Sequence, residues 1–553
     1  MAASGKKYLG DVLVLGMGGT GAAVCRYLAS QGPGRVSSVT LYGGASSREG
    51  GLSRELEAAG VRCVLGTEDV AGSYDLAVAS PGISEFSAFF SAARACAREV
   101  IGEPEFAFRE SPERWVAITG TNGKTTTTSL TTHLLQVAGM GAEAVGNIGT
   151  IITGELAARP ADGWLVAELS SFQLATTRLL HPRVATLLNV TPDHVEWHGS
   201  LEAYAAAKEK VFANLGEGDL AIVSVDDDWC RAVRDRLVAR GVATCELSVE
   251  GEPASADAAF VRDGMLVVRA SGVEHELLAA GTLKIRGRHN WENALAAAAC
   301  ALHLGVSDEA LARGLADFNP IEHRIEPCGT HAGVHFVNDS KATNTDSVEK
   351  ALTAFGAGSI VVMLGGHDKM TDLASLAAAV CGTCRAAVCF GAAGERIAHS
   401  VEEARRATGS AVQVIRAPHM REAFDAAVAA ARPGDTVLLS PACSSFDEFN
   451  NMAERGTSRT SWPASARTGS RAWLSREPIR GTPAGAPRRR RPGPARRVSP
   501  ARARRPAGAA RRAASAVPSR GPRGRSSACR SASCARGSSS SPRSCSSRPL
   551  AAS

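Results

Sequence analysis

The sequence contains no apolar run long enough to cross a membrane. Nowhere in its 553 residues do about 18 apolar side chains follow one another, which is the least that a spanning helix needs. The first ten residues also lack the apolar core of a secretory signal and lead directly into a strand-like run at 11–15. We therefore expect a cytoplasmic protein with no membrane partner.

Few of the cysteines stand at the short spacings that are typical of metal sites. Of the 14 cysteines, the 11 that precede residue 457 are scattered singly except for Cys381, Cys384 and Cys389. Cys381-x-x-Cys384 is a spacing found in zinc and redox sites, but no second pair completes a set of four zinc ligands. The sequence favours the alternative, small buried residues in a reducing compartment.

The last 97 residues, 457–553, have no lysine and a single acidic residue, Glu477. They contain 23 arginines and carry a net charge of +22; because the whole chain is +7, residues 1–456 carry −15. The segment is rich in Arg, Pro, Ser, Ala and Gly and has no apolar periodicity. Such a composition cannot bury enough surface to offset chain entropy, so it predicts a disordered basic tail.

Residues 1–456 have the pattern of an α/β protein. Short runs of Val, Ile and Leu alternate with Ala-rich helical stretches, which is typical of parallel sheets covered by helices. A single core stops growing near about 250–300 residues, so a chain of this length predicts several domains. We place three of them at 1–108, 109–320 and 321–456.

The first domain opens with Gly16-x-Gly18-x-x-Gly21 between a strand-like run and a helical stretch. Backbone amides at such a turn, together with the helix N-terminus, can bind a diphosphate. An NAD site would also need an acidic residue at the end of the second strand, where residues 41–44 read LYGG, without Asp or Glu. This favours a different diphosphate, such as a UDP-sugar, over NAD; a tight turn without a ligand is the alternative.

The second domain contains a stronger motif, GTNGKTT at 120–126, between a strand-like run and a helical stretch. Glycines let backbone N–H groups surround phosphate oxygens, Lys124 neutralises the β- and γ-phosphates, and the Thr125 hydroxyl can bind Mg²⁺. The loop is shorter than the usual motif, because Ile118 stands where the first glycine is expected. It nevertheless predicts a site for a nucleoside triphosphate.

Further polar residues follow the strands of the second domain. Glu168 ends one apolar run, and an Asn189–His194 segment ends another. Ligands bind at the carboxyl ends of parallel strands, so both could belong to a metal and phosphate site, although a lone acid there can also be a solvated edge residue. Composition alone makes Lys208, in a helical segment, a solvent-facing lysine.

Nine motifs together resemble the Mur ligases over about residues 10–456. In chain order they are GTNGKTT, AELSSFQL, LNVTPDH, YAAAK, GRHNWENALAA, HRIE, NDSKATN, LGG-x-x-K and LSPACSSFD. NDSKATN and SPACSSFD favour the branch of the family that adds D-glutamate. L-alanine-adding relatives typically have a histidine in the P-loop, and folylpolyglutamate synthases lack the UDP-binding first domain.

The resemblance implies a fold and an activity. The expected domains are a Rossmann-like UDP-binding domain, a central P-loop ATPase-like domain and a C-terminal Rossmann-like domain that binds the amino acid. The expected reaction is ATP-dependent ligation of D-glutamate to UDP-N-acetylmuramoyl-L-alanine through an acyl phosphate, in peptidoglycan precursor synthesis, by a monomer that needs no nucleic acid. The alternatives are another Mur-type or folylpolyglutamate-type amide ligase, or a non-catalytic protein that binds nucleotides or nucleic acid.

The resemblance also implies a role for each matching residue. ATP is expected at Gly120, Thr121, Asn122, Gly123, Lys124, Thr125, Thr126, Asn293, Arg324 and Asp339. The UDP-substrate is expected at Thr20, Ser80 and Asn147, and D-glutamate at Thr343, Lys369, Ser445 and Phe446. Two Mg²⁺ ions are expected at Thr125, Glu168, His194 and Lys208, with Lys208 carbamylated. Lys124, His194 and Lys208 are the expected catalytic residues.

The chain departs from the family pattern after residue 456. A C-terminal helix should follow NNMAERG, but the sequence continues with TSRTSWPASARTG. Loss of a packed helix, at about 25 cal/mol per Å² of apolar surface, removes several kcal/mol, which is comparable with the stability margin of a domain. The D-glutamate pocket, next to this point, is the part most affected.

We predict that residues 457–553 result from out-of-frame translation of a GC-rich gene. Arg, Pro, Ala, Gly and Ser are the residues that GC-rich codons specify, and the change in composition is abrupt. A basic tail that binds nucleic-acid phosphates is the alternative. Resequencing the 3′ end of the gene tests this, and an unbroken reading frame in independent reads would refute it.

Overall fold

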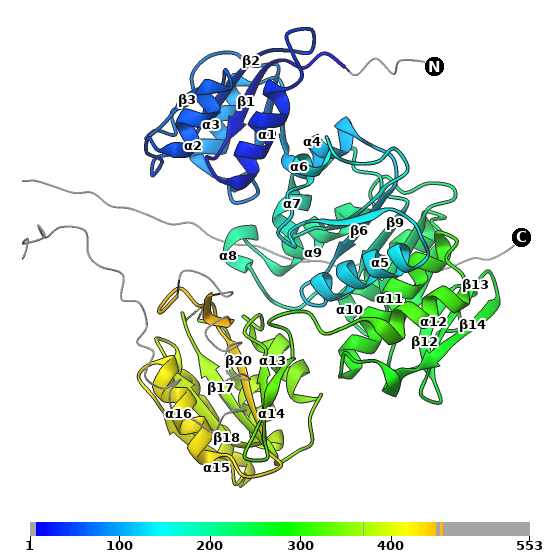
Figure 1. Ribbon diagram of the computed structural model, residues 1–553, viewed down its shortest axis with the longest axis vertical. Coiled ribbons are helices and arrows are strands. Elements are labelled where there is room, and N and C mark those ends of the chain that lie inside the picture. Colours follow the sequence, from blue (N-terminus) through cyan, green and yellow to red (C-terminus); the bar gives the residue numbers. More distant parts are fainter. Residues whose placement is uncertain (1–6, 369, 450–453, 457–553) are drawn as a thin grey trace, which may run out of the picture. The chain divides into compact units, whose positions relative to one another are not determined.

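Three sheets, each covered by helices, make up the part of the chain that the computed structural model describes, residues 7–368, 370–449 and 454–456 (Figure 1). Lys369 and the predicted tail lie outside the described residues. Most neighbouring strands are parallel, so the predicted α/β class is confirmed. No helix in the described ranges is long and apolar enough to cross a membrane.

The first sheet has five parallel strands in the order β3-β2-β1-β4-β5. Its elements are β1 (Gly10–Leu15), α1 (Gly19–Ala29), β2 (Val36–Tyr42), α2 (Gly51–Ala58), β3 (Arg62–Val64), β4 (Leu76–Ala79), α3 (Ala88–Cys96), β5 (Val100–Gly102) and α4 (Glu103–Glu110). Apolar clusters cover both faces. The strand order reverses between β1 and β4, which places the glycine turn after β1 at the position where such sheets bind ligands.

The second sheet has nine strands in the order β14-β13-β12-β11-β10-β9-β6-β8-β7. The strands are β6 (Trp115–Thr119), β7 (Ala142–Gly146), β8 (Trp164–Glu168), β9 (Val184–Leu187), β10 (Leu220–Ser224), β11 (Thr244–Leu247), β12 (Ala258–Arg262), β13 (Met265–Ala270) and β14 (Val273–Ala279). Strands β12 to β14 form an antiparallel ribbon at one edge, which the sequence analysis did not predict. The other strands pair in parallel.

Helices bury the second sheet on both faces. One apolar cluster joins the sheet to α5 (Lys124–Val137), α11 (Arg288–His303) and α12 (Asp308–Asp317). The other joins it to α7 (Ser171–Ala175), α9 (Leu201–Glu209) and α10 (Asp228–Ala239). Two short helices, α6 (Ile152–Glu155) and α8 (Val195–His198), lie in the connections. The loops at the carboxyl ends of β6, β8 and β9 therefore rest on a sheet that is packed on both sides.

The third sheet has six strands in the order β15-β16-β20-β17-β18-β19, of which only β15 is antiparallel. The strands are β15 (Glu326–His331), β16 (Val334–Asn338), β17 (Ile360–Gly365), β18 (Cys384–Phe390), β19 (Gln413–Arg416) and β20 (Thr436–Ala442). The helices are α13 (Thr345–Leu352), α14 (Ala374–Thr383), α15 (Gly394–Thr408) and α16 (Met420–Ala430). Cys381 and Cys384 pack in the apolar core of this sheet, in agreement with the interpretation as ordinary packed residues.

Helix α4 runs across the predicted boundary between residues 108 and 109. Pro104 at its start and the acidic residues Glu103 and Glu105 in its first turn all favour a helix N-terminus here. The chain is thus helical on both sides of that boundary, up to Glu110. The three domain boundaries themselves stay predictions.

We predict that Gly21→Ala destabilises the first sheet by about 1–3 kcal/mol, the cost of overpacking a dense site. A Cβ at Gly21 would lie 1.9 Å from the carbonyl oxygen of Gly16, so the turn would have to open. Gly18→Ala is the matched control, because a Cβ there meets no atom within 4 Å. Urea unfolding monitored by far-UV circular dichroism measures the difference in stability. Equal stability of the two variants would refute the prediction.

Candidate active site

The loop at 120–126 joins β6 to α5, as the sequence predicted. Gly120 and Gly123 have φ angles of 153° and 85°, which side chains with a Cβ rarely adopt. A Cβ at Gly123 would also lie 2.4 Å from the Oδ1 atom of Asn293. Glycine at these positions therefore lets the backbone approach α11 closely and leaves the N-terminus of α5 open to an anion.

Lys124 lies at the start of α5 with its ammonium turned back over the loop. Its Nζ donates to the carbonyl oxygens of Gly120, at 3.0 Å, and Thr121, at 2.8 Å. Burial lowers the pKa of Lys124, and Glu168 and Asp193 oppose that shift. The ammonium is thus held at the centre of the loop and close to two carboxylates.

Lys208 is buried, which excludes the solvent-facing interpretation. Its side chain on α9 is 1% exposed, and its Nζ donates to the carbonyl oxygen of Gly120 at 2.7 Å. The ammonium also lies 4.5 Å from the ring centroid of Tyr204. Burial, and then the charge of Lys124, hold the pKa of Lys208 well below its usual value. Two lysines therefore converge on one backbone oxygen.

Glu168 is buried as well, which excludes the interpretation as a solvated edge residue. It ends β8 with 1% exposure, and its Oε1 accepts a hydrogen bond of 2.7 Å from the Nδ2 of Asn147. Its other oxygen, Oε2, has no partner among the described residues. A buried carboxylate oxygen without a partner is costly, so this atom is a candidate ligand for a cation.

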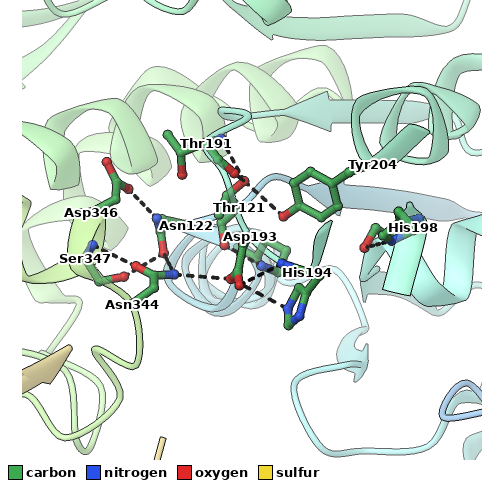
Figure 2. A network of polar contacts seen from close by, with 12 residues as sticks. Thr121, Asn122, Thr191, Asp193, His194, His198, Tyr204, Asn344, Asp346 and Ser347 are labelled. Atoms are coloured by element: carbon green, nitrogen blue, oxygen red, sulfur yellow. Dashed lines mark hydrogen bonds and ion pairs between the residues drawn. The ribbon is translucent and has the colours of Figure 1, made fainter. Parts of the chain in front are cut away.

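His194 follows β9 and has a φ angle of 53°, in the left-handed region. Its ring packs edge-on against Phe172 at 4.7 Å between centroids, and its Nε2 lies 3.6 Å from a carboxylate oxygen of Asp193. Figure 2 shows His194 beside Asp193, with Thr121 and Tyr204 joined by a hydrogen bond of 3.0 Å nearby. The TPDH segment is thus packed against the phosphate loop.

The donor atoms present fit magnesium. Within the described residues no group of three or more His, Cys, Asp or Glu side chains converges as a preformed metal site. Mg²⁺ does not need such a cage, because it keeps several waters and binds through one or two carboxylates and substrate phosphates. The buried Thr125 hydroxyl and the unpaired oxygen of Glu168 are donors of this kind.

A pocket beside the loop brings together five of the predicted ATP-binding residues: Asn122, Gly123, Asn293, Arg324 and Asp339. Asn189, from the segment that the sequence placed near a phosphate site, also lines it, together with six residues for which the sequence indicated no role: His289, Glu292, Ile325, Ser347, Lys350 and Ala351. Asp339 accepts from the Ser440 hydroxyl at 2.6 Å, and burial raises its pKa to about 6. Of the other loop residues, Thr126 is buried and its hydroxyl has no partner in the described chain.

The residues predicted for the UDP-substrate fall into two places. Thr20 is in the first turn of α1, and Ser80 follows β4 at the glycine turn, where a Cβ on Gly16 would lie 2.9 Å from the Ser80 hydroxyl. The Ser80 hydroxyl has no partner in the described part of the chain. Asn147, by contrast, donates a side-chain hydrogen bond to Glu168. A second pocket in the first sheet, which the sequence did not reveal, is lined by Ser47, Arg48, Glu49, Glu57, Cys63, Leu65 and Gly66.

Three of the residues predicted for D-glutamate, Thr343, Ser445 and Phe446, follow strands of the third sheet. Thr343 is half-buried, Ser445 is buried, and Phe446 is 69% exposed. Lys341, inside the NDSKATN motif but not assigned a role there, has its pKa lowered to about 8 by burial and by Arg324. Its position in a quoted motif was the signal that could have identified it.

Arg455 connects the NDSKATN and SPACSSFD motifs of the third domain. It is 1% exposed and donates to the carbonyl oxygens of Ser340, at 2.9 Å, and Cys443, at 3.0 Å. Burial lowers its pKa to about 10. In the sequence this segment marks only the end of the family match, and no pattern there predicts a role for Arg455.

The fold and the loop define an α/β protein of the P-loop nucleotide-binding class. Residues 118–301 match the Mur ligase middle domain, and residues 323–443 match the Mur ligase glutamate ligase domain. The UDP-N-acetylmuramoylalanine–D-glutamate ligase of Pelotomaculum thermopropionicum is 38% identical over 450 residues, covering 80% of this chain and 95% of that protein. The enzyme of the same name from Rubrobacter xylanophilus is 40% identical over 447 residues, covering 80% and 96%. The chain belongs to the Mur ligase family.

Two solved structures share the fold at low sequence identity. A pseudomurein peptide ligase type C from Methanothermus fervidus is 17% identical, with a TM-score of 0.50 over 78% of this chain and 96% of that one. MurF from Acinetobacter baumannii is 19% identical, with a TM-score of 0.50 over 70% and 91%. These likenesses concern the fold alone.

Proposed function

We propose that this chain joins D-glutamate to UDP-N-acetylmuramoyl-L-alanine at the expense of ATP, in the synthesis of peptidoglycan precursors. The observation that carries the proposal is the identity of 38–40% to ligases of that name, over 95% or more of the two relatives' length. The enzyme would act as a monomer in the cytoplasm. The ammonium groups of Lys124 and of the buried Lys208 both donate to the carbonyl oxygen of Gly120, and this positive charge at the loop supports the use of ATP.

In the first step, the terminal carboxylate of the sugar peptide attacks the γ-phosphate of ATP, which forms an acyl phosphate and releases ADP. Both reactants are anions, so the step requires positive charge at the loop, and Lys124 supplies it. When bound, Mg²⁺ ions held by Thr125, Glu168, His194 and Lys208 would offset the remaining phosphate charge. Gly120 to Thr126 would orient the phosphates through backbone N–H groups.

In the second step, the amine of D-glutamate attacks the acyl carbon, the amide bond forms, and inorganic phosphate leaves. Thr343, Lys369 and Ser445, with Phe446 nearby, would hold the two carboxylates of D-glutamate, because a dianion requires cationic and hydroxyl donors. Thr20, Ser80 and Asn147 would hold the UDP-substrate. Asn293, Arg324 and Asp339 would hold the adenine and ribose side of ATP in the pocket that they line.

Lys208 would carry CO₂ as a carbamate. Only a neutral amine takes up CO₂, and at the usual pKa about one lysine in a few thousand is neutral at pH 7. The burial that lowers the pKa of Lys208 raises that fraction. The Lys208 ammonium would first lose one proton, and attack of the neutral amine on CO₂ would form the N–C bond and release a second proton. The resulting carbamate anion would supply metal ligands next to the cations of the loop.

We expect Lys124→Ala to reduce turnover to background, because Lys124 is the only charged residue of the loop at 120–126. The measurement is phosphate release with ATP, Mg²⁺ and UDP-N-acetylmuramoyl-L-alanine, with each candidate amino acid added in turn. Release that depends on D-glutamate supports the proposal. Near-normal activity of the variant, or release with a different amino acid only, would count against it. A truncation after residue 456 repeats the assay without the tail.

Lys208→Ala should also lose activity, but a small carboxylic acid such as formate should restore part of it. The acid would occupy the space of the deleted side chain and replace the carbamate anion. Lys210→Ala is the matched control, since Lys210 is only partly buried and donates to the carbonyl oxygen of Ala175, away from the loop. A folded Lys208→Ala enzyme that no carboxylic acid restores would leave Lys208 without a carbamate role.

A further inference from the structure

The side chain of Asn122 in the phosphate loop is held by the first turn of α13. Its Oδ1 accepts from the Ser347 hydroxyl at 2.6 Å and from the Nδ2 of Asn344 at 3.4 Å. Its Nδ2 donates to the carboxylate of Asp346. Figure 2 shows these three residues gathered around Asn122. Both polar ends of one loop side chain are therefore bound by a single turn of a helix.

Other hydrogen bonds hold both sides of this contact, the first turn of α13 and the phosphate loop. Asn344 is the N-cap of α13, where its side chain accepts from the backbone N–H of Ser347 at 2.9 Å. The backbone N–H of Asn122 donates to the Oδ1 of Asn189 at 2.8 Å, which anchors the loop to the end of β9. Asp346 is also paired with Lys350 at 3.0 Å, one turn further along the helix.

Helix α13 lies between the two places where small substrates are proposed to bind. It begins two residues after Thr343, one of the residues proposed for D-glutamate. Its last turns place Lys350 and Ala351 in the lining of the nucleotide pocket. The Asn344 side chain also reaches Asp193, beside His194, at 3.5 Å. A shift of this helix would therefore move the Asn122 side chain and, through it, the phosphate loop.

We propose that Ser347 and Asp346 are positioning residues for the phosphate loop: they hold the Asn122 side chain and thereby set the affinity of the loop for ATP. The inference rests on the ATP-binding part of the proposed function. Ser347 also lines the pocket, so a direct contact with the nucleotide is the competing explanation. The two explanations differ in whether the effect of Ser347 requires Asn122.

A double-mutant cycle separates them. The dissociation constant of Mg·ATP is measured by calorimetry on the full chain, and the KM for ATP and kcat by phosphate release, for Ser347→Ala, Asn122→Ala and the double variant. Loss of one hydrogen bond corresponds to about a 3–10-fold change. We expect Ser347→Ala to raise the dissociation constant and the KM for ATP by this factor with kcat nearly unchanged, and to add less than twofold when Asn122 is already alanine. Asp346→Ala should behave in the same way.

Glu349→Gln is the matched control. Glu349 is on the same helix, but its carboxylate accepts from the Ser375 hydroxyl at 2.8 Å and not from the loop, so ATP binding should stay unchanged. Equal effects of Ser347→Ala with and without Asn122, or no effect at all, would overturn the inference. A chain that binds ATP and shows the expected cycle but releases no phosphate with D-glutamate would refute the proposed ligase and leave the positioning role standing.

Discussion

The site depends on one backbone carbonyl, that of Gly120, which accepts hydrogen bonds from the half-buried Lys124 and the buried Lys208. Lys124 reaches it at 3.0 Å and Lys208 at 2.7 Å. Two ammonium groups at one oxygen repel each other in surroundings that also penalise each charge. Such an arrangement is stable only if one amine loses its charge or anions are brought in. ATP, the proposed carbamate and the buried carboxylate of Glu168 would each offset this repulsion, so the same electrostatic constraint favours nucleotide binding and the carbamylation proposed for Lys208.

The sheet explains why these groups meet although they are far apart in the chain. β6, β8 and β9 are neighbours and parallel, so the phosphate loop, Glu168 and the TPDH segment leave the sheet at the same edge. Apolar clusters on both faces of the sheet support that edge. Lys208 lies on α9. Tyr204, on the same helix, is buried and forms a hydrogen bond with the Thr121 hydroxyl. The rigidity of the site is thus a property of the sheet, and its charge is a property of the side chains at the strand ends.

Local patterns in the sequence predicted the α/β class, the strand–loop–helix around Lys124 and the glycine turn after β1, because each depends on residues close together in the chain. The burial of Lys208 could not be predicted in this way: its helix has no feature that distinguishes an inward from an outward lysine until β6 is placed beneath it. The contact of Asn122 with Ser347 joins residues 225 positions apart, and no spacing rule connects them. The ribbon β12 to β14 was missed because its alternating pattern is short and interrupted by turns. The roles of the site residues came from resemblance to the family and remain proposals.

The antiparallel ribbon at the edge of the second sheet has a consequence for how copies of the chain behave at high concentration. Its outermost strand, β14, has mostly exposed side chains, and Arg262 and Arg269 form a network of ion pairs with Glu252 and Glu274 across the ribbon. Another strand could pair with this edge only by disturbing those charges, which discourages edge-to-edge aggregation. The folded chain can therefore keep a large sheet with an open edge and still disfavour its growth from one copy to the next.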